Sequence, residues 1–454
     1  MTMSRYIQMR NPEYVLQQVC RFLKAGLIGC LLYGVQVYAA LPIQHWVTEN
    51  GARVFFVETH AIPVLDISVE FDAGSRRDPA GKAGLAALTN GSLDKGIARS
   101  GVADITEAQI LDTFADAGAL RSNKTSMDRA GYSLRVMSGQ AESDAAIRMM
   151  AQLLASPSFP QALLTRDKAR LVASLREEMT RPDSIAAKAF RKDIYPKHPY
   201  GESSTPESVE QITRDDLMDF HKTHYVANRV VISLVGDIDI ERARRIAQEI
   251  SGGLRVSDQE LPVLPDVTVA NGKTNVIAHP ATQAHILIGM PALKRGDPDF
   301  FALTVGNYIL GGGGFSSRLM QEVREKRGLS YSVYSQFQPM FQPGPFMIGL
   351  QTEKKQATDA IGVVNDTLND FLRNGPDTTE LQSARDHLVN SFAMQMDNNL
   401  KVLELIAMIG YYHLPLDYLD HWTEKVGQVT AADVKAAMNR KLNAEKMVTV
   451  IVGQ

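Results

Sequence analysis

The chain has 454 residues, of which 44% are hydrophobic and 22% are charged. This length allows two domains that each bury a core of their own. The formal net charge is −3 and no run of basic residues occurs, which excludes the electrostatic signature of a nucleic-acid-binding protein. We therefore expect no nucleic-acid partner.

The first forty residues differ in composition from the rest. An uncharged stretch at 25–40 follows four basic residues, Arg5, Arg10, Arg21 and Lys24. A basic front, an apolar middle and a small-residue end are typical of a secretory signal peptide. We predict a signal peptide at 1–40, cleaved after Ala39 or nearby, and a periplasmic or otherwise exported protein.

Two other interpretations of this segment stay open. An uncleaved anchor fits less well, because the stretch is interrupted by Gln36 and is shorter than the about 20 apolar residues that span a bilayer. No stable membrane span is therefore expected after signal cleavage. A mitochondrial presequence is the third interpretation.

Both cysteines, Cys20 and Cys30, lie in this segment. A mature chain that begins after it has no thiol, so it can form neither a disulfide nor a cysteine-based metal site. The stretch Leu27–Cys30 resembles a lipoprotein cleavage box, and lipidation is an alternative to plain cleavage.

The remaining chain contains an internal repeat. A shift of 217 residues aligns three pairs of stretches: Leu164–Leu171 with Leu381–Leu388, Glu207–Leu217 with Glu424–Val434, and Val230–Gly236 with Met447–Gly453. Self-similarity at a fixed shift indicates a duplicated structural unit.

Each half follows the pattern of a strand, several helices and a final helix that leads to a closing strand. We therefore expect an α+β fold of two homologous mixed α/β domains arranged around a cleft. The domains are predicted at 41–253 and 273–454. The linker is predicted at 254–272, where Pro262, Pro265 and Gly272 punctuate a polar stretch without helical periodicity.

Motifs in both halves resemble one known family. The motifs are Ala73–Ala86, His198–Gly201, Asn228–Asp237 and Asn307–Tyr334, the last with four consecutive glycines, Arg324 and Tyr331. They are similar to stretches of the pitrilysin/insulinase (peptidase M16) family of zinc peptidases. The resemblance covers nearly all of the chain after residue 40.

The family's zinc motif is His-x-x-Glu-His on a helix, where two imidazoles bind the metal and the Glu activates its water. The corresponding window here is Ala87–Gly91, so both ligands and the general base are absent. Asn90 cannot take up and return a proton as a carboxylate can. The family's N-terminal domain is thus expected at 41–253 with a degenerate zinc motif.

The family's third zinc ligand is a later Glu, and the candidates here are Glu177 and Glu178, between which the register is not fixed. One carboxylate falls short of the three protein ligands that zinc usually has. His221 and His224, three residues apart in a predicted helix, would also need a third ligand and a base, so we interpret them as core or surface histidines. We predict no metal site in this chain, and zinc in a partner subunit.

Arg324 and Tyr331 have the spacing of the family's Arg/Tyr motif, which places them on one side of a helix end or of the turn after it. The resemblance implies a catalytic role, in which both groups hold a peptide carbonyl and stabilise the oxyanion formed when zinc-bound hydroxide attacks. Without the resemblance, they would be interpreted as a surface Arg and a packed Tyr.

The glycine run lacks the Gly-Lys-Ser/Thr ending of a phosphate-binding loop. Resemblance to zinc-less subunits of the family implies a substrate-binding loop formed by Gly311, Gly312, Gly313, Gly314 and Phe315. The alternative is that the glycines end a helix.

The family includes pairs in which one chain carries the zinc motif and its relative carries the Arg/Tyr motif, and this chain resembles the second. We expect a non-catalytic subunit whose partner is a homologous M16 subunit with an intact zinc motif. The expected substrates are extended or unfolded peptides, because a closed chamber excludes folded domains. A non-enzymatic peptide-binding or scaffold protein of the same fold is the alternative, and an enzyme active alone through an unrecognised site is a third hypothesis.

Overall fold

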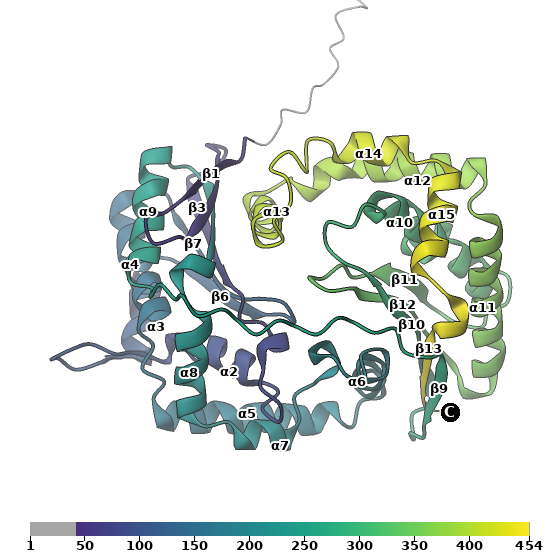
Figure 1. Cartoon of the computed structure of the whole chain (residues 1–454), viewed down its shortest axis with the longest axis horizontal. Coiled ribbons are helices and arrows are strands. Elements are labelled where there is room, and N and C mark those ends of the chain that lie inside the picture. The colour runs from purple at the N-terminus through teal and green to yellow at the C-terminus, as the bar shows by residue number, and fades with distance from the viewer. Residues whose placement is uncertain (1–41, 454) are drawn as a thin grey trace, which may run out of the picture. The chain divides into compact units, whose positions relative to one another are not determined.

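The computed structural model describes residues 42–453. The predicted signal peptide at 1–40 lies outside this range. The described chain is a mixed α/β fold with two large sheets, one from each half of the sequence, as the repeat predicts (Figure 1). None of the helices in this range is both long and apolar enough to cross a membrane.

The first sheet has the strand order β1-β2-β8-β3-β7-β6 and is antiparallel except where β2 pairs with β8. Its strands are β1 (Gln44–Val47), β2 (Arg53–Glu58), β3 (Val64–Phe71), β6 (Leu120–Thr125), β7 (Ala130–Met137) and β8 (Val231–Gly236). A separate short ribbon joins β4 (Gly96–Ile97) to β5 (Ile105–Thr106).

The second sheet has the order β11-β12-β10-β13-β9 and is antiparallel except where β13 pairs with β9. Its strands are β9 (Lys273–Ile277), β10 (Gln283–Leu293), β11 (Val333–Phe337), β12 (Gly344–Glu353) and β13 (Val448–Val452).

The helices of the first half are α2 (Leu85–Gly91), α3 (Glu107–Asp116), α4 (Gln140–Ala155), α5 (Gln161–Glu178), α6 (Pro182–Ile194), α7 (Pro206–Gln211), α8 (Arg214–His224) and α9 (Ile240–Gly252). Those of the second half are α10 (Phe300–Asn307), α11 (Ala357–Asn374), α12 (Thr378–Ser391), α13 (Asn399–Tyr411), α14 (Trp422–Gln428) and α15 (Ala431–Lys441).

Short helical turns complete the described chain. The 3₁₀ turns are η1 (Ser75–Arg77), η2 (Leu93–Lys95), η3 (Pro199–Gly201), η4 (Ala227–Arg229), η6 (Gly314–Ser316), η8 (Lys354–Gln356), η9 (Phe392–Gln395) and η10 (Ala444–Lys446). Two π-helical turns are η5 (Tyr308–Gly312) and η7 (Met320–Glu325).

Residues that repeat in the sequence have a structural role at helix starts. Thr213 caps α8 and Thr430 caps α15, each as part of a capping box with an Asp three residues on. In both boxes the Thr hydroxyl accepts the backbone N–H of the Asp, and the carboxylate accepts the N–H of the Thr. The repeat therefore preserves the groups that satisfy the first backbone donors of these helices.

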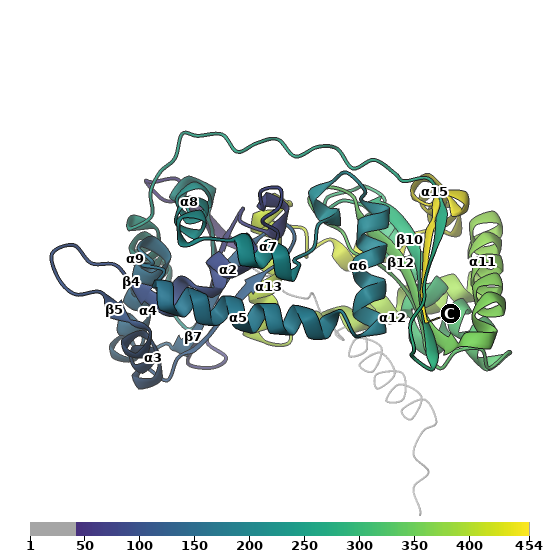
Figure 2. The same ribbon diagram turned by 90° about the horizontal axis from the view of Figure 1, so that it is seen from below.

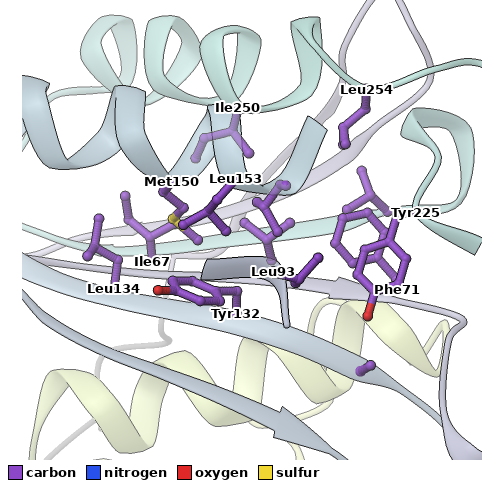
Figure 3. Packing of buried hydrophobic residues seen from close by; sticks show 14 of the residues in the cluster. Ile67, Phe71, Leu93, Tyr132, Leu134, Met150, Leu153, Tyr225, Ile250 and Leu254 are labelled. Atoms are coloured by element: carbon purple, nitrogen blue, oxygen red, sulfur yellow. The ribbon is translucent and has the colours of Figure 1, made fainter. Parts of the chain in front are cut away.

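Burial along the strands shows how the first sheet is covered. Strand β7 alternates between buried and half-buried residues, whereas β3 and β8 are buried almost throughout. Side chains of α4 and α9, including Met150 and Ile250, pack with Ile67 and Leu134 of the sheet in one core cluster (Figure 3). Because β3 and β8 are buried on both faces, another element must cover the face of the sheet opposite α4 and α9.

That cover is α13, which belongs to the second half of the sequence and contacts β2, β3 and β8 of the first sheet. Helix α6, from the first half, contacts β10 and β13 of the second sheet in the same way (Figure 1). A shift of 217 residues maps α6 onto α13 from end to end. The two halves thus exchange the same helix of the repeat.

Glycines allow both exchanged helices to lie close to their sheets. A Cβ on Gly410 of α13 would lie 2.5 Å from the Phe55 ring of β2, and one on Gly289 of β10 would lie 3.0 Å from the Phe190 ring of α6. A larger side chain at Gly410 has no room there.

The segment between the halves runs without helix or strand from residue 256 to residue 272 (Figure 2). Side chains of the first half hold its backbone: Asn228 donates to the Ser257 carbonyl at 2.8 Å, and Arg229 to the Gln259 carbonyl at 2.7 Å. Arg77 donates to the Pro262 carbonyl at 2.7 Å. The next residue, Val263, is 95% exposed.

Candidate functional site

Helix α2 contains the window Ala87–Gly91, which the sequence resemblance aligns with the family's metal helix. Its start is fixed by Asp78, whose carboxylate accepts the backbone N–H groups of Gly84 at 2.8 Å and Ala86 at 2.7 Å. Burial raises the pKa of Asp78 to about 6. Gly84 has a φ of +107°, a conformation that an L-residue with a side chain rarely adopts.

Asn90 is the fourth residue of the window Ala87–Gly91, the position that the resemblance aligns with the family's general base. Its amide donates to the backbone carbonyls of Lys124, at 3.2 Å, and Gly131, at 3.1 Å. Its oxygen accepts the Tyr225 hydroxyl at 3.2 Å, and the side chain is buried. All polar groups of Asn90 are thus engaged in joining α2 to the sheet and to the end of α8.

The residues at this position do not fit a zinc ion. Ala87 and Gly91 have no donor atoms, and the oxygen of Asn90 is already hydrogen bonded. Across residues 42–453, no group of three or more His, Cys, Asp or Glu side chains is placed to hold a metal. We derive no step through a metal bound by this chain.

The other candidate zinc ligands are two glutamates near the surface and two histidines, and each histidine is hydrogen bonded to a backbone carbonyl. Glu177 is exposed at the end of α5, and Glu178 forms an ion pair with Lys188 of α6 at 2.9 Å. His221 bonds through Nε2 to the Leu154 carbonyl and His224 bonds through Nδ1 to the Asp72 carbonyl, both at 2.8 Å. Burial lowers the pKa of each histidine to about 4, so both are neutral packing groups at pH 7.

Arg324 and Tyr331 meet in the structure. Arg324 lies in the last turn of η7, which is anchored by the buried side chains of Met320 and Val323, and Tyr331 lies in the segment before β11. The guanidinium carbon of Arg324 lies 4.8 Å from the centre of the Tyr331 ring. The spacing of seven residues therefore brings the two groups together at a helix end, as the sequence predicts.

Phe315 is the third member of this group. The Arg324 guanidinium lies 4.7 Å from the centre of the Phe315 ring, so it contacts one aromatic ring from η6 and another from the segment before β11. Phe315 is 63% exposed and Tyr331 is 83% exposed. We call Phe315, Arg324 and Tyr331 the Arg–aromatic cluster.

The four glycines before Phe315 differ in their surroundings. A Cβ on Gly311 would lie 2.5 Å from the backbone nitrogen of Ser335, one on Gly312 would lie 2.6 Å from the Asn307 amide, and one on Gly313 would lie 2.7 Å from the Tyr308 carbonyl. Gly314 has open space around it and a φ of +60°. The helical run through α10 and η5 ends inside this stretch, as the helix-end interpretation expects.

A buried polar network that sequence reasoning missed joins the two halves. The Asp128 carboxylate accepts hydrogen bonds from Arg76 at 2.8 Å, Tyr200 at 2.5 Å and Tyr412 at 2.8 Å. It also accepts the backbone N–H of Phe341 at 2.8 Å. Two of these residues lie in motifs named above, Arg76 in Ala73–Ala86 and Tyr200 in His198–Gly201, but neither motif indicated the network.

Comparison with known proteins identifies the family. A family model described as the peptidase M16 inactive domain matches residues 211–388. A crystal structure of a peptidase M16 inactive domain from Pseudomonas fluorescens is 36% identical to this chain, with a TM-score of 0.86. The match covers 91% of this chain and 98% of that one.

The chain belongs to the peptidase M16 family.

Other relatives are named either as a non-peptidase homolog or as uncharacterized zinc proteases. A Helicobacter pylori protein named non-peptidase homolog YmxG is 26% identical over 88% of this chain and 90% of its own length. An uncharacterized zinc protease of Streptomyces coelicolor is 31% identical over 54% of this chain and 55% of its own length. The family model and the Pseudomonas fluorescens structure that match this chain are both described as peptidase M16 inactive domains.

Proposed function

We propose that this chain is the zinc-less subunit of an exported M16-type zinc peptidase and supplies Arg324 and Tyr331 to a zinc-bearing M16 partner. The Arg–aromatic cluster carries the proposal, because two of its three side chains are largely exposed while the chain's own metal helix has no ligands. Large aromatic side chains at a protein surface frequently mark an interaction site.

The chemistry of the cluster suits peptide hydrolysis. Arg324 can donate charge-assisted hydrogen bonds and Tyr331 can donate its hydroxyl, so together they can hold a peptide carbonyl oxygen. The same donors stabilise the negative charge that develops on this oxygen when a nucleophile attacks. The partner's zinc would supply the activated water, and a chamber between subunits would select extended or unfolded peptides.

The proposed export rests on the segment 1–40, with its basic front and apolar stretch. Amino-terminal sequencing of the protein purified from periplasmic extract tests this part separately. A mature terminus near Leu41 supports export, and an intact Met1 in the cytoplasmic fraction contradicts it.

The shared site is tested by purifying the chain with a homologue that has His-x-x-Glu-His and assaying peptide hydrolysis by the pair. Arg324→Ala and Tyr331→Phe should each lower kcat/KM by roughly tenfold to a thousandfold, the range seen when one oxyanion donor is removed. Arg327→Ala and Tyr334→Phe are matched controls, since these residues lie in the same segment outside the cluster. Wild-type activity in both cluster variants would refute the shared site.

A peptide-binding or scaffold protein without a catalytic partner is the second candidate, and one observation favours it. Strand β6 is the last strand of the first sheet, and most of its side chains are exposed. An extended peptide can add to such an edge through backbone hydrogen bonds. Peptide binding by the isolated chain, together with failure to recover a zinc-motif homologue on co-purification, would support this candidate.

A further inference from the structure

A cavity of about 880 Å³ lies between the two halves, away from the Arg–aromatic cluster. One wall is the face of the first sheet that carries Ser68, Ser122 and Ser133. The opposite wall comes from the second half, from the segments around Met340, α13 and the start of α14. Its size lies in the range of sites for small organic molecules or short peptide ends.

Arg295 brings an unpaired positive charge into this cavity. It follows β10, and its backbone N–H donates to the Met340 carbonyl at 2.7 Å, which fixes its position on the wall. The guanidinium carbon lies 5.6 Å from the centre of the Tyr412 ring. Within the described residues, no carboxylate pairs with Arg295, and its buried Nε has no hydrogen-bond partner.

The other charged side chains of the cavity have partners or offset one another. Arg129 pairs with Glu70, and Lys401 pairs with Asp397 at 2.8 Å. Asp128 accepts the hydrogen bonds of the network described above. Lys124 and Glu404 are exposed and of opposite sign, so they add no net charge. The unmatched charge of the cavity is therefore that of Arg295.

Aromatic and apolar side chains line the same cavity as Arg295. Phe300 and Tyr418 lie close together, with ring centres 6.4 Å apart, and both line the cavity with Trp422. Met394 is 60% exposed and Leu400 is 47% exposed, although both are apolar cavity residues. Apolar side chains left open beside the half-buried Arg295 favour a ligand with a negative end and an apolar body.

We propose that this cavity binds a carboxylate joined to an apolar group, with the carboxylate on Arg295 and the apolar group against Phe300, Tyr418 and Trp422. Arg is protonated throughout the physiological pH range and its planar fork matches a carboxylate, so the two form paired hydrogen bonds. The carboxylate can come from the C-terminus of a hydrophobic peptide or from a free organic acid. This inference does not depend on the proposed function.

Trp422 provides the readout. The chain has two tryptophans, and Trp46 lies in β1, so Trp46→Phe leaves Trp422 as the single indole. Trp422 stacks on Phe392 with ring centres 4.4 Å apart, and a ligand in the cavity should change its fluorescence. The three probes are acetyl-Leu-Leu-Phe with a free carboxylate, the same peptide with a C-terminal amide, and 3-phenylpropionate, each also titrated by calorimetry.

The free-acid peptide should bind with a Kd below about 1 mM, and the amide at least about tenfold more weakly, because it cannot form the charged pair. Arg295→Gln should remove this preference, while Arg295→Lys should keep part of it. Lys294→Gln is the matched control, since it removes an equal charge from an exposed neighbour outside the cavity and should bind like wild type.

The two sources of the carboxylate are distinguished by 3-phenylpropionate. If 3-phenylpropionate binds saturably, the cavity is a site for organic acids in general. If the free-acid peptide binds and 3-phenylpropionate does not, the cavity is a site for a peptide C-terminus. Equal affinity of acid and amide, unchanged binding by a folded Arg295→Gln variant, or no saturable signal or heat with any probe would each overturn the proposal. Circular dichroism of each variant confirms that it is folded.

Discussion

Asn90 shows how a residue that replaces a catalytic group becomes part of the fold. Where a metal helix needs a base beside a water molecule, this chain has an amide that bonds to two strand carbonyls and to the Tyr225 hydroxyl. Tyr225 is buried, so the loss of Asn90 would leave its hydroxyl without this hydrogen bond inside the protein. Restoring a single ligand at α2 would therefore disturb packing before it rebuilt a metal site.

The buried histidines predict a pH dependence at the residue scale. Burial lowers the pKa of His224 to about 4, against about 6.5 in the unfolded chain. Between pH 6.5 and about pH 4, His224 is protonated in the unfolded state but neutral in the folded state. The contribution of His224 to the free energy of unfolding is therefore complete above pH 6.5 and declines as the pH falls to 4, by roughly 3 kcal/mol.

His224→Asn should remove this contribution, because the amide keeps a donor for the Asp72 carbonyl but does not titrate. Urea unfolding at several pH values between 4 and 7 measures the difference. The variant should show a shallower fall in stability than wild type, with His221 still contributing in the same direction. Parallel curves for variant and wild type would contradict the assignment.

At the scale of elements, the packing of α13 on the first sheet depends on Gly410. We expect Gly410→Leu to destabilise the protein by about 1–3 kcal/mol, because the added side chain meets the Phe55 ring and the Val231 side chain. Gly427→Ala is the matched control, since a Cβ there has open space in α14 and should stabilise the helix by up to about 1 kcal/mol. Thermal and urea unfolding measure both, and equal stability of the two variants would refute the close packing.

The exchange of α6 and α13 also shows the limit of sequence prediction. The shift of 217 residues, found in other stretches, also relates α6 to α13, and the aligned stretches Glu207–Leu217 and Glu424–Val434 contain the starts of α8 and α15. An apolar stripe on a helix shows that one face is buried, but it does not identify the sheet that covers it. Which sheet each helix joins depends on contacts between residues far apart in the sequence, such as Phe190 and Gly289.

The sequence also predicted only part of the candidate site. The spacing of Arg324 and Tyr331 placed them on one side of a helix end, where the structure brings them into contact. Phe315 was expected as part of a glycine loop, and its contact with Arg324 could not be read from spacing. The Asp128 network was missed because its members come from five separate segments, and the motifs that contain Arg76 and Tyr200 do not show which side chains meet at Asp128.

At the scale of the whole described chain, the exchanged helices and the Asp128 network should hold the halves together without the linker. We expect a specific protease site introduced after Val263 to be cut readily, because this residue is 95% exposed. The two fragments should still elute together from a size-exclusion column under native conditions and separate only in denaturant. Separation under native conditions would show that the linker holds the halves together.

The exchange of one helix between equivalent halves has a consequence for how such a chain could arise. A single copy of the repeat would have a helix without its sheet and a sheet with one face exposed. In a pair of copies, the helix of each copy could cover the exposed sheet face of the other. Such a self-complementary contact is found in twofold-symmetric dimers. An ancestor with one repeat would therefore have been stable as a homodimer, and gene fusion would have turned its subunit interface into the interior of one chain.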